Sequence, residues 1–386
     1  MAEIKNLKKV AQRILKAIRN KERIILYGDA DLDGISSIII LKEAISNLGG
    51  KVEKVYFPDR EKEGYGINKM ALKFLEKTAP ALFISLDCGI SNFEEVNKAN
   101  SMGFEIIIID HHQVLDKLPK AEIIVDPKQK GDKYPFKELS TAGITYKLSQ
   151  VLLQDQLCES LKNNFLELVA LATIADMMVE EKDNRIMIEH GLFSLENTFR
   201  PGLKAFFEKD TIKDNNILST RQIAQKIISA LNIVEVKDHL NETYLLLTSN
   251  SLEEAKIKVE ELFKKREQKQ LIVKEILEEI ENRVFKKTSD PIVFEGDVSW
   301  PLILLGGVAS RICNQHKKPA FIFRIGDKVS RGAVRTPQEV NGVDLMNTCS
   351  KLLETFGGHP RASGFTIKTK NIEKFKECLV KKLCAK

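Results

Sequence analysis

Apolar and polar positions follow two rhythms along the first half of the chain. Short apolar runs have the length of buried strands and lie at Ile24–Tyr27, Val52–Phe57, Leu82–Leu86, Ile106–Ile109 and Ile123–Val125. Between several of them, positions with helical periodicity lie at Ser36–Asn47, Asn68–Lys77 and Phe93–Met102. Strands that alternate with helices predict a parallel sheet with right-handed crossovers. Ligands of such sheets bind at the carboxyl ends of the strands.

An amphipathic helix is predicted at residues 5–20. Its apolar positions include Leu7, Val10, Ile14 and Ile18, and lysines and arginines occupy the opposite face. A basic helix of this kind can lie on nucleic acid or on a membrane. We favour the simpler interpretation, a helix docked on the sheet with its basic face in solvent.

A different pattern begins near residue 251. Residues 251–285 are rich in Glu and Lys with helically spaced apolar positions, which predicts one long helix or two. Strand-like runs at 292–294, 320–323 and 329–334 then alternate with helical patterns at 305–314, 343–353 and 373–383. The predicted fold is therefore α/β: an N-terminal parallel-sheet domain at 1–205, a helical connector at 206–286 and a smaller α/β domain at 287–386. A chain of 386 residues is long enough for two such cores.

Acids and imidazoles stand where the predicted strands end. Asp29, Asp31 and Asp33 follow the first strand, Asp87 the third, and Asp110-His111-His112 the fourth. Each motif alone is also explained as a polar turn or a helix N-cap, which accounts for one aspartate and not three. Together at one sheet edge they would repel one another unless a cation neutralises them, and their oxygen and imidazole donors suit Mn²⁺ or Mg²⁺. Asp176, which closes the apolar stretch Phe165–Ile174, needs either a positive partner or solvent.

Composition limits the possible ligands and the possible location of the protein in the cell. The net charge of +6 is compatible with a polyanionic ligand without requiring one. No run of about 18 apolar residues occurs, and the first 23 residues lack the apolar core of a secretory signal. We therefore expect a cytoplasmic protein that does not associate with membranes. The scattered cysteines predict reduced thiols and neither a disulfide framework nor a zinc site; they are Cys88, Cys158, Cys313, Cys349, Cys378 and Cys384.

Four separated motifs resemble motifs I to IV of the DHH phosphoesterase superfamily, and most closely its RecJ-like single-strand exonuclease branch. They are GDADLDG at 28–34, LDCG at 86–89, IDHH at 109–112 and ATIAD at 172–176. Ser140-Thr141-Ala142-Gly143 and Arg200-Pro201-Gly202-Leu203 support the match. The stretch GGHPRASG at 357–364 resembles the GGH motif of the associated DHHA1 domain. The resemblance implies a DHH domain joined to a DHHA1 domain, with the active site in the cleft between them.

The resemblance also implies roles for individual residues. Asp31, Asp33, Asp87, His111 and Asp176 match positions that hold a pair of Mn²⁺ or Mg²⁺ ions, and Asp29 and Asp110 match acids that support this metal site. Asp87 is the expected bridging ligand, because one carboxylate has two oxygens to share. His112 matches a histidine beside the scissile phosphate, so Asp87, Asp110 and His112 are the expected catalytic residues. In the second domain, the expected substrate-binding residues are Arg335, Gly357, Gly358, His359 and Arg361.

The sequence departs from the RecJ pattern mainly around its substrate contacts. An Asn-Ala-Ala-Gly-Arg run is replaced by Asn232–Val236, so an arginine expected to meet the substrate phosphate is absent. Ala333 stands where a serine is expected two residues before the phosphate-binding Arg335. Stacking on bases would fall to a few aromatic residues, although core packing is expected for most of them: Tyr56, Phe57, Tyr65, Phe356 and Trp300.

These observations predict a metal-dependent phosphodiester hydrolase, an exonuclease that degrades single-stranded DNA or RNA through water activated by two metal ions. One alternative is a hydrolase of very short oligonucleotides or cyclic dinucleotides. Another is a replisome-associated structural subunit, which is disfavoured because all the expected metal-ligand positions are filled. The expected partner is single-stranded nucleic acid or a short oligonucleotide, with replication or repair proteins left open.

Overall fold

The computed structural model describes residues 3–114, 117–208, 219–232, 236–284 and 290–384. It divides into two compact units, Met1–Arg266 and Glu267–Lys386. The division falls inside one helix, and each unit is described below by itself. The described residues do not include the predicted domain boundary between residues 286 and 287. They also do not include Ile233–Glu235, which belong to the stretch that differs from the RecJ pattern.

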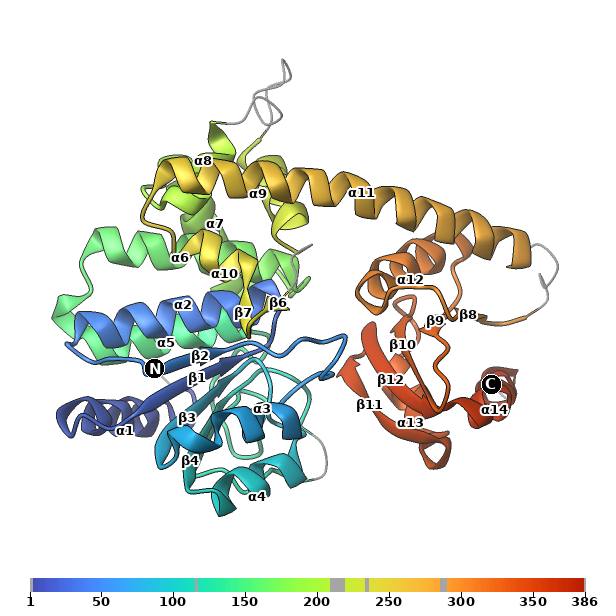
Figure 1. Ribbon diagram of the computed structural model, residues 1–386, viewed down its shortest axis with the longest axis horizontal. Coiled ribbons are helices and arrows are strands. Elements are labelled where there is room, and N and C mark those ends of the chain that lie inside the picture. The colour runs from blue at the N-terminus through green and yellow to red at the C-terminus, as the bar shows by residue number, and fades with distance from the viewer. Residues whose placement is uncertain (1–2, 115–116, 209–218, 233–235, 285–289, 385–386) are drawn as a thin grey trace. The chain divides into compact units, whose positions relative to one another are not determined.

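A five-stranded parallel sheet organises the N-terminal unit (Figure 1). Its strand order is β2-β1-β3-β4-β5, and each strand pairs in parallel with its neighbour, which confirms the predicted α/β architecture. The strands are β1 (Ile24–Gly28), β2 (Lys54–Tyr56), β3 (Ala81–Leu86), β4 (Phe104–Ile109) and β5 (Ile123–Val125).

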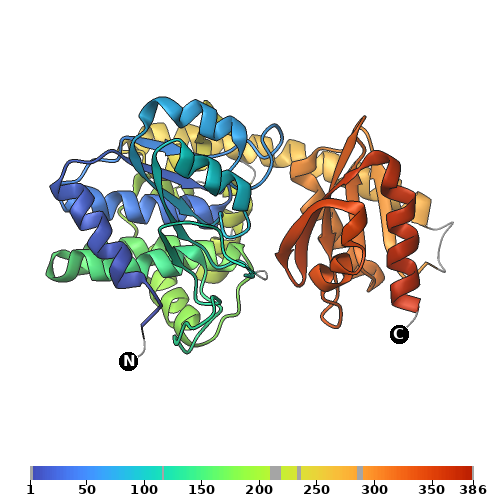
Figure 2. The ribbon, with the colours of Figure 1, turned by 90° about the horizontal axis from the view of Figure 1, so that it is seen from below.

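Two layers of helices cover this sheet because both of its faces are apolar (Figures 1 and 2). Ile25 and Tyr27 of β1 face the layer of α3 and α4, whereas Ile24 and Leu26 face the other layer. Burial on both sides explains why β1, β3 and β4 appear in the sequence as nearly continuous apolar runs. The helices are α1 (Leu7–Arg19), α2 (Leu32–Asn47), α3 (Lys69–Leu75), α4 (Phe93–Ser101), α5 (Thr141–Leu153) and α6 (Glu159–Ala175).

The basic N-terminal helix α1 is docked, as predicted. Leu7, Val10, Ala11 and Ile14 are buried in the main core of the unit. Lys8, Lys9, Lys16 and Arg19 of this helix are exposed.

Much of the predicted connector packs into the same core. Ala224, Ile227, Leu246 and Leu247 are buried in it beside the sheet helices. Close helix approach at Gly191, where a Cβ would lie 2.1 Å from the Leu166 carbonyl oxygen, fixes α7 against α6. The elements between α6 and the long helix that follows residue 251 are α7 (Lys182–Leu195), α8 (Pro201–Phe207), α9 (Thr220–Leu231), the hairpin β6 (Val236–Lys237) and β7 (Leu240–Asn241), and α10 (Glu242–Leu247).

The long helix α11 (Leu252–Val284) is continuous over 33 residues, so of the two predicted possibilities, one helix or two, the single helix is the one that forms. Ala255 and Val259 in its first half are buried in the core of the N-terminal unit. Ile276 and Ile280 in its second half are buried in the C-terminal unit. Each half is therefore held by the apolar core of a different unit.

A mixed sheet forms the C-terminal unit, in the order β11-β12-β10-β9-β8. Strands β8 and β9 are parallel, and the other pairs are antiparallel. Helix α12 covers one face, while α13 and α14 cover the other. The elements are β8 (Val293–Asp297), α12 (Leu302–His316), β9 (Ala320–Arg324), β10 (Val329–Arg335), α13 (Gly342–Asn347), β11 (Leu353–His359), β12 (Ala362–Lys368) and α14 (Ile372–Cys384).

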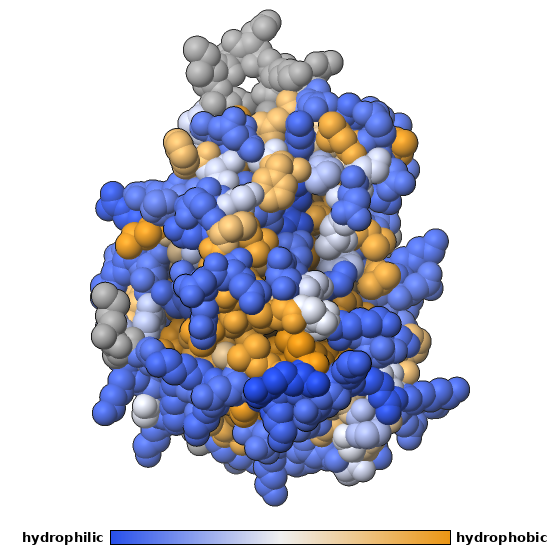
Figure 3. Space-filling view, turned by 90° about the vertical axis from the view of Figure 1, so that its left-hand side faces the viewer, coloured by the Kyte–Doolittle hydropathy of each residue, from blue (hydrophilic) through white to orange (hydrophobic). Residues whose placement is uncertain are grey.

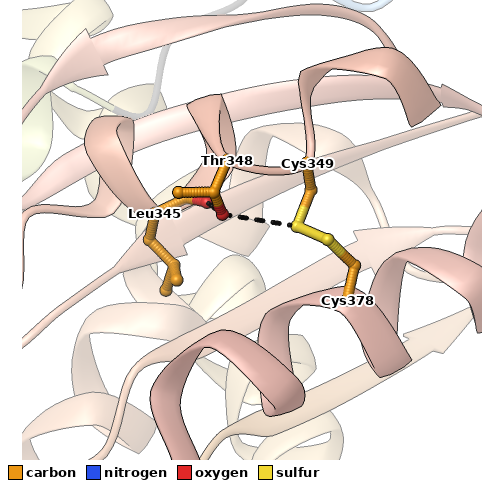
Figure 4. The surroundings of a disulfide bond; sticks show 4 residues. All are labelled: Leu345, Thr348, Cys349 and Cys378. Atoms are coloured by element: carbon orange, nitrogen blue, oxygen red, sulfur yellow. Dashed lines mark hydrogen bonds between the residues drawn. A yellow bond between two sulfur atoms is a disulfide. The ribbon is translucent and has the colours of Figure 1, made fainter. Parts of the chain in front are cut away.

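Two predictions for the C-terminal unit are wrong. The helix expected at 343–353 ends at Asn347, because a separate 3₁₀ turn at Ser350–Leu352 leads the chain into β11, which begins at Leu353. The cysteines are not all reduced, since Cys349 and Cys378 form a disulfide between the segment after α13 and helix α14 (Figure 4). Packing of α13 against α14 brings these two Cα atoms to 6.2 Å, within the range that a disulfide spans. Cys88, Cys158 and Cys313 are free thiols, and the side chain of Cys384 lies outside the described residues.

The face of the protein in Figure 3 is mostly hydrophilic, with apolar side chains gathered near its centre. Among the described residues, no helix combines the length and the apolar character that crossing a bilayer requires.

Candidate metal centre

The acids and histidines predicted for the N-terminal unit lie together at the carboxyl end of its sheet. His111, which follows β4, is at their centre and is 1% exposed. Its Nε2 lies 3.3 Å from Asp87 Oδ1, 3.5 Å from Asp176 Oδ2 and 3.8 Å from Asp33 Oδ2. One donor atom each from Asp29, Asp31 and Asp87 also lies within 4.8 Å of the other two. The structure thus brings together donors that the sequence separates by up to 147 residues, from position 29 to position 176.

Asp33 and Asp87 are held by the N-terminus of α5. The backbone amides of Thr141 and Ala142 donate to the two oxygens of Asp33 at 2.7 and 2.8 Å. The Thr141 hydroxyl donates to Asp87 Oδ1 at 3.0 Å. Ser140 caps the helix by accepting a hydrogen bond from the Gly143 amide. This geometry explains the Ser-Thr-Ala-Gly motif, because a helix N-terminus offers free amides to an anion.

Helix α2 begins at Leu32, four residues before the predicted start. Asp31 is its N-cap and accepts a hydrogen bond from the Gly34 amide at 3.2 Å. Asp33 therefore lies in the first helical turn. Gly34 leaves room for the preceding loop, since a Cβ at this position would lie 2.4 Å from the Asp29 carbonyl oxygen.

Asp87 adopts a backbone conformation that is uncommon for a residue with a side chain. Its φ is 62°, in the left-handed region, and Gly89 follows with φ 119°. The turn is fastened by the Ser85 hydroxyl, which donates to the Cys88 carbonyl at 2.6 Å. Strained backbone of this kind is characteristic of functional sites. Here the turn places the Asp87 side chain in the cluster.

Asp110 orients His112. Its Oδ1 lies 2.7 Å from His112 Nδ1 and accepts hydrogen bonds from the amides of His111 and His112. Its Oδ2 accepts a hydrogen bond from the Ile90 amide at 3.1 Å. Burial alone would lower the pKa of His112, but the Asp110 carboxylate overcomes it and raises that pKa to about 9. Both oxygens of Asp110 are therefore occupied by hydrogen-bond partners.

The remaining carboxylates repel one another. Burial, reinforced by Asp31, raises the pKa of Asp33 from its ordinary value of 3.8 to about 7. Burial together with Asp33 and Asp31 also raises the pKa values of Asp87 and Asp176 well above the ordinary range. Buried carboxylates with hard oxygen donors beside one imidazole fit Mn²⁺ or Mg²⁺.

One basic residue of the site was not predicted. Arg60, in the loop after β2, donates from Nε to Asp29 Oδ1 at 2.8 Å and from Nη2 to Asp31 Oδ2 at 2.9 Å. The strand-end rule could have located it, because β2 ends at the same sheet edge as β1. This ion pair balances part of the acidic charge, most of all at Asp29, because Arg60 donates to both oxygens of Asp29 and to only one oxygen of Asp31.

The aromatic residues that were candidates for base stacking differ in their exposure. Tyr56, Phe57 and Trp300 are buried in the cores, as expected for most of them. Tyr65 is 48% exposed, and its hydroxyl lies 3.3 Å from His112 Nε2. Of these four aromatic residues, Tyr65 is the one that is exposed beside the candidate metal centre.

The substrate-binding residues predicted for the C-terminal unit lie at one end of β10, β11 and β12. Arg335 Nε donates to Ser310 Oγ on α12 at 3.1 Å. His359 lies opposite Ala362, which in turn lies opposite Arg335. Arg361 is in the exposed turn between β11 and β12. Gly357 and Gly358 belong to β11 and not to a Gly-Gly turn, and the chain reverses after them.

The raised carboxylate pKa values predict an unusual pH dependence of stability. The metal-free folded state keeps a proton on Asp33 up to about pH 7, whereas the unfolded chain loses it near 3.8. Stability in EDTA should therefore fall as pH rises between these values, because the folded state binds more protons there. Mn²⁺ should reverse the fall. Melting temperatures at about pH 5 and pH 8, with and without Mn²⁺, test this, and Asp33→Asn should flatten the EDTA profile. An EDTA profile that rises across this window in the wild type would contradict it.

Comparison with known families agrees with this geometry. The family model described as "DHH family, N-terminal domain" matches residues 23–173, which contain the first three acidic motifs and the α5 cap. The "DHHA1 domain" model matches residues 291–384. The chain contains a DHH domain followed by a DHHA1 domain. Its DHH domain carries the candidate metal centre, and its DHHA1 domain carries the Gly357–Gly364 stretch.

Individual relatives resemble this two-domain chain over nearly its whole length. It is 32% identical to the single-stranded-DNA-specific exonuclease RecJ of Bacillus subtilis over 378 residues, or 96% of the chain. It is 30% identical to RecJ of Thermus thermophilus over 94% of the chain. The chain spans only 47% and 52% of these two curated relatives. A crystal structure of exonuclease RecJ bound to manganese matches with a TM-score of 0.78 and 25% identity, and covers 98% of this chain and 94% of that one.

Proposed function

We propose that the chain is a metal-dependent exonuclease that hydrolyses phosphodiester bonds of single-stranded DNA. The observation that carries this proposal is the cluster around His111, where oxygens of Asp33, Asp87 and Asp176 lie within 3.8 Å of its Nε2. Homology to RecJ, named as specific for single-stranded DNA, supports the substrate class.

Five side chains are proposed to hold two Mn²⁺ or Mg²⁺ ions: Asp31, Asp33, Asp87, His111 and Asp176. When bound, such ions supply Lewis acidity and lower the pKa of coordinated water. Asp29 has a different part, because its oxygens already accept from Arg60 and from the Ala30 amide. It supports the loop that carries Asp31.

His112 is proposed to act on the phosphate. The Asp110 carboxylate keeps the His112 ring protonated near neutral pH and fixes the position of Nδ1. A protonated imidazole can donate a hydrogen bond to a non-bridging oxygen or give a proton to the leaving oxygen. The exposed ring of Tyr65 beside it offers a surface on which a base can stack.

Single-stranded DNA and RNA of graded length, labelled at either end and incubated with Mn²⁺, test the proposal. We expect DNA strands of about 20 nucleotides to be shortened progressively from one end and duplex DNA to resist, since stacking and charge contacts favour single strands. EDTA is the control and should stop the reaction. Cleavage of dinucleotides without cleavage of the longer strands would instead identify a short-oligonucleotide hydrolase. No hydrolysis of any of these substrates would favour the structural role.

A further inference from the structure

We propose that His239, at the tip of the β6–β7 hairpin, is a positioning residue for the candidate metal centre. It contacts the loop between β2 and α3, residues 57–68, which we call the Arg60 loop because it carries Arg60. The hairpin itself is fixed to the helix that begins at Asp31. The inference rests on the proposed function and adds to it how the Arg60 loop is held in place beside the acids.

The hairpin, β6 and β7 in Figure 1, is attached to helix α2 through α10. Helix α10 follows β7 directly and buries Leu246 and Leu247 in the main core of the N-terminal unit. Its Tyr244 hydroxyl accepts a hydrogen bond from Lys42 Nζ of α2 at 2.8 Å. Because Asp31 is the N-cap of α2, the hairpin and the first acidic motif are held by the same packed helices.

Asn241 in β7 connects the hairpin to the acidic motif directly. Its side chain is buried, and its Oδ1 caps α10 by accepting a hydrogen bond from the Thr243 amide at 2.7 Å. Its Nδ2 donates to the Ala30 carbonyl oxygen at 3.1 Å. Since Ala30 stands between Asp29 and Asp31, this bond fixes the backbone from which both acids project. The base of the hairpin is therefore anchored to the metal centre.

His239 occupies a turn position that usually favours glycine. Two residues, Asp238 and His239, join β6 to β7, and their φ values are 51° and 62°. A two-residue hairpin with two positive φ values prefers Asn-Gly or Asp-Gly. A residue with a large side chain is uncommon in this region, and such strain is characteristic of functional sites. The histidine is explained if its ring is needed where the turn places it.

The ring and backbone of His239 reach the Arg60 loop and its surroundings. The ring centroid lies 4.3 Å from that of Tyr56, nearly parallel at 17°, and 4.3 Å from that of Phe74. The His239 carbonyl accepts a hydrogen bond from the Phe57 amide at 2.9 Å, at the first residue of the loop. His239 Nδ1 lies 3.6 Å from Glu63 Oε1, in the middle of the loop.

Glu63 transmits this contact to the loop. Its side chain is only 4% exposed, and a buried carboxylate is unfavourable unless its oxygens have partners. Its Oε2 accepts hydrogen bonds from the Tyr56 hydroxyl at 2.8 Å and from Asn68 Nδ2 at 3.1 Å. His239 lies at the other oxygen. Loss of the imidazole would therefore remove a fixed point between the two ends of the loop.

The Arg60 loop brings two side chains to the centre. Arg60 Nη2 donates to Asp31 Oδ2 at 2.9 Å. The Tyr65 hydroxyl donates to the Asp87 carbonyl oxygen at 3.2 Å. The hairpin contacts the Asp31 loop at its base and the Arg60 loop at its tip, so it sets the position of one relative to the other. A displacement of about 1 Å in such a site is enough to lower a rate roughly a hundredfold.

The first test releases the loop without breaking the turn. His239→Asn should fold, because asparagine tolerates positive φ, but its side chain is too short to replace the ring. Hydrogen exchange of the peptide that covers residues 57–68, measured in EDTA, should become about tenfold faster, while peptides from β1 stay unchanged. His239→Gly, with the residue that the turn prefers, is the second variant and should give the same result.

Asp238→Asn is the matched control for the exchange measurement. It places the same residue at the other turn position, which is exposed and points to no part of the Arg60 loop among the described contacts. Its exchange over residues 57–68 should equal that of the wild type. Wild-type exchange of this peptide in both His239 variants would overturn the proposal.

The second test asks whether His239 acts through the Arg60 loop. Tyr65→Ala and His239→Asn should each weaken binding of a fluorescent oligo-dT of about 20 nucleotides, in EDTA, by roughly tenfold, as expected for loss of one stacked base. The double variant should bind like either single variant, because a released loop no longer presents Tyr65. Independent losses, which multiply to about a hundredfold, would overturn the positioning role.

The two tests separate this inference from the proposed function. Hydrogen exchange requires neither substrate nor metal, so it reports on the His239 contact alone. A chain whose loop exchanges as expected, but which neither binds nor cleaves single-stranded DNA, would contradict the proposed function and leave the contact between hairpin and loop established.

Discussion

Asp87→Asn is expected to abolish Mn²⁺-dependent hydrolysis without unfolding the protein. The substitution removes the anionic oxygen that lies 3.3 Å from His111 Nε2 at the centre of the donor cluster. Loss of a metal ligand forfeits several kcal/mol of transition-state stabilisation, so the rate should fall by at least about a thousandfold. Activity on end-labelled single-stranded DNA measures the effect.

Stability provides the second readout of Asp87→Asn. Burial and the neighbouring acids raise the pKa of Asp87, which shows that its charged form is unfavourable in the metal-free protein. Asparagine keeps an oxygen for the Thr141 hydroxyl and tolerates a φ of 62°. The melting temperature in EDTA should therefore equal or exceed that of the wild type, while the stabilisation by Mn²⁺ should shrink. Asp183→Asn on α7 is the control and should leave activity unchanged. An active Asp87→Asn variant would refute the metal assignment.

Gly34→Ala is expected to damage the site through a single methyl group. The added Cβ would lie 2.4 Å from the Asp29 carbonyl oxygen and 2.8 Å from the Asp29 amide nitrogen, so the loop or the helix must move. Overpacking in a buried site costs about 1–3 kcal/mol, and backbone atoms cannot move aside as a flexible side chain can. Displacement of Asp29 and Asp31 by even about 1 Å should lower activity roughly a hundredfold.

Chemical denaturation and the same nuclease assay measure these two losses. Gly307→Ala in α12 is the comparison, because a Cβ there would meet no atom within 4 Å. It should keep or raise stability by up to about 1 kcal/mol, as expected for alanine in a helix. Equal stability and activity of Gly34→Ala and the wild type would show that the loop before α2 is not fixed by this contact.

The parts of the fold that could be predicted are those in which local pattern and burial agree. The strands of the first sheet were recognised because both faces are covered, so nearly every residue in them is apolar. The acidic site followed from the rule that parallel strands end at one edge. Asp31 as the N-cap of α2 was also recoverable, since its side chain meets the amide three residues later.

Features that depend on tertiary contact were not recoverable. Cys349 and Cys378 are separated by 29 residues, and only the packing of α13 on α14 brings them together. Residues 348–353 continue a helical pattern of apolar positions. The chain nevertheless forms strand β11 from Leu353 onward, because these residues pair with β12. The difference between Gly357 and Gly358 is also invisible in the sequence, because a Cβ at Gly358 would lie 2.7 Å from the Ala362 carbonyl oxygen, whereas a Cβ at Gly357 would meet no atom within 4 Å.

The order of the metal donors along the chain has a consequence for biosynthesis. They arise in sequence from β1, α2, β3, β4 and finally the C-terminal end of α6, where Asp176 lies. The α5 amides that hold Asp33 also come late, at residues 141 and 142. A nascent chain therefore carries Asp33 and Asp87 without the contacts that hold them until residues 141 and 142 have been made. Tight cation binding should appear only once α5 and α6 have left the ribosome, so the ion is expected to bind late in the folding of this domain.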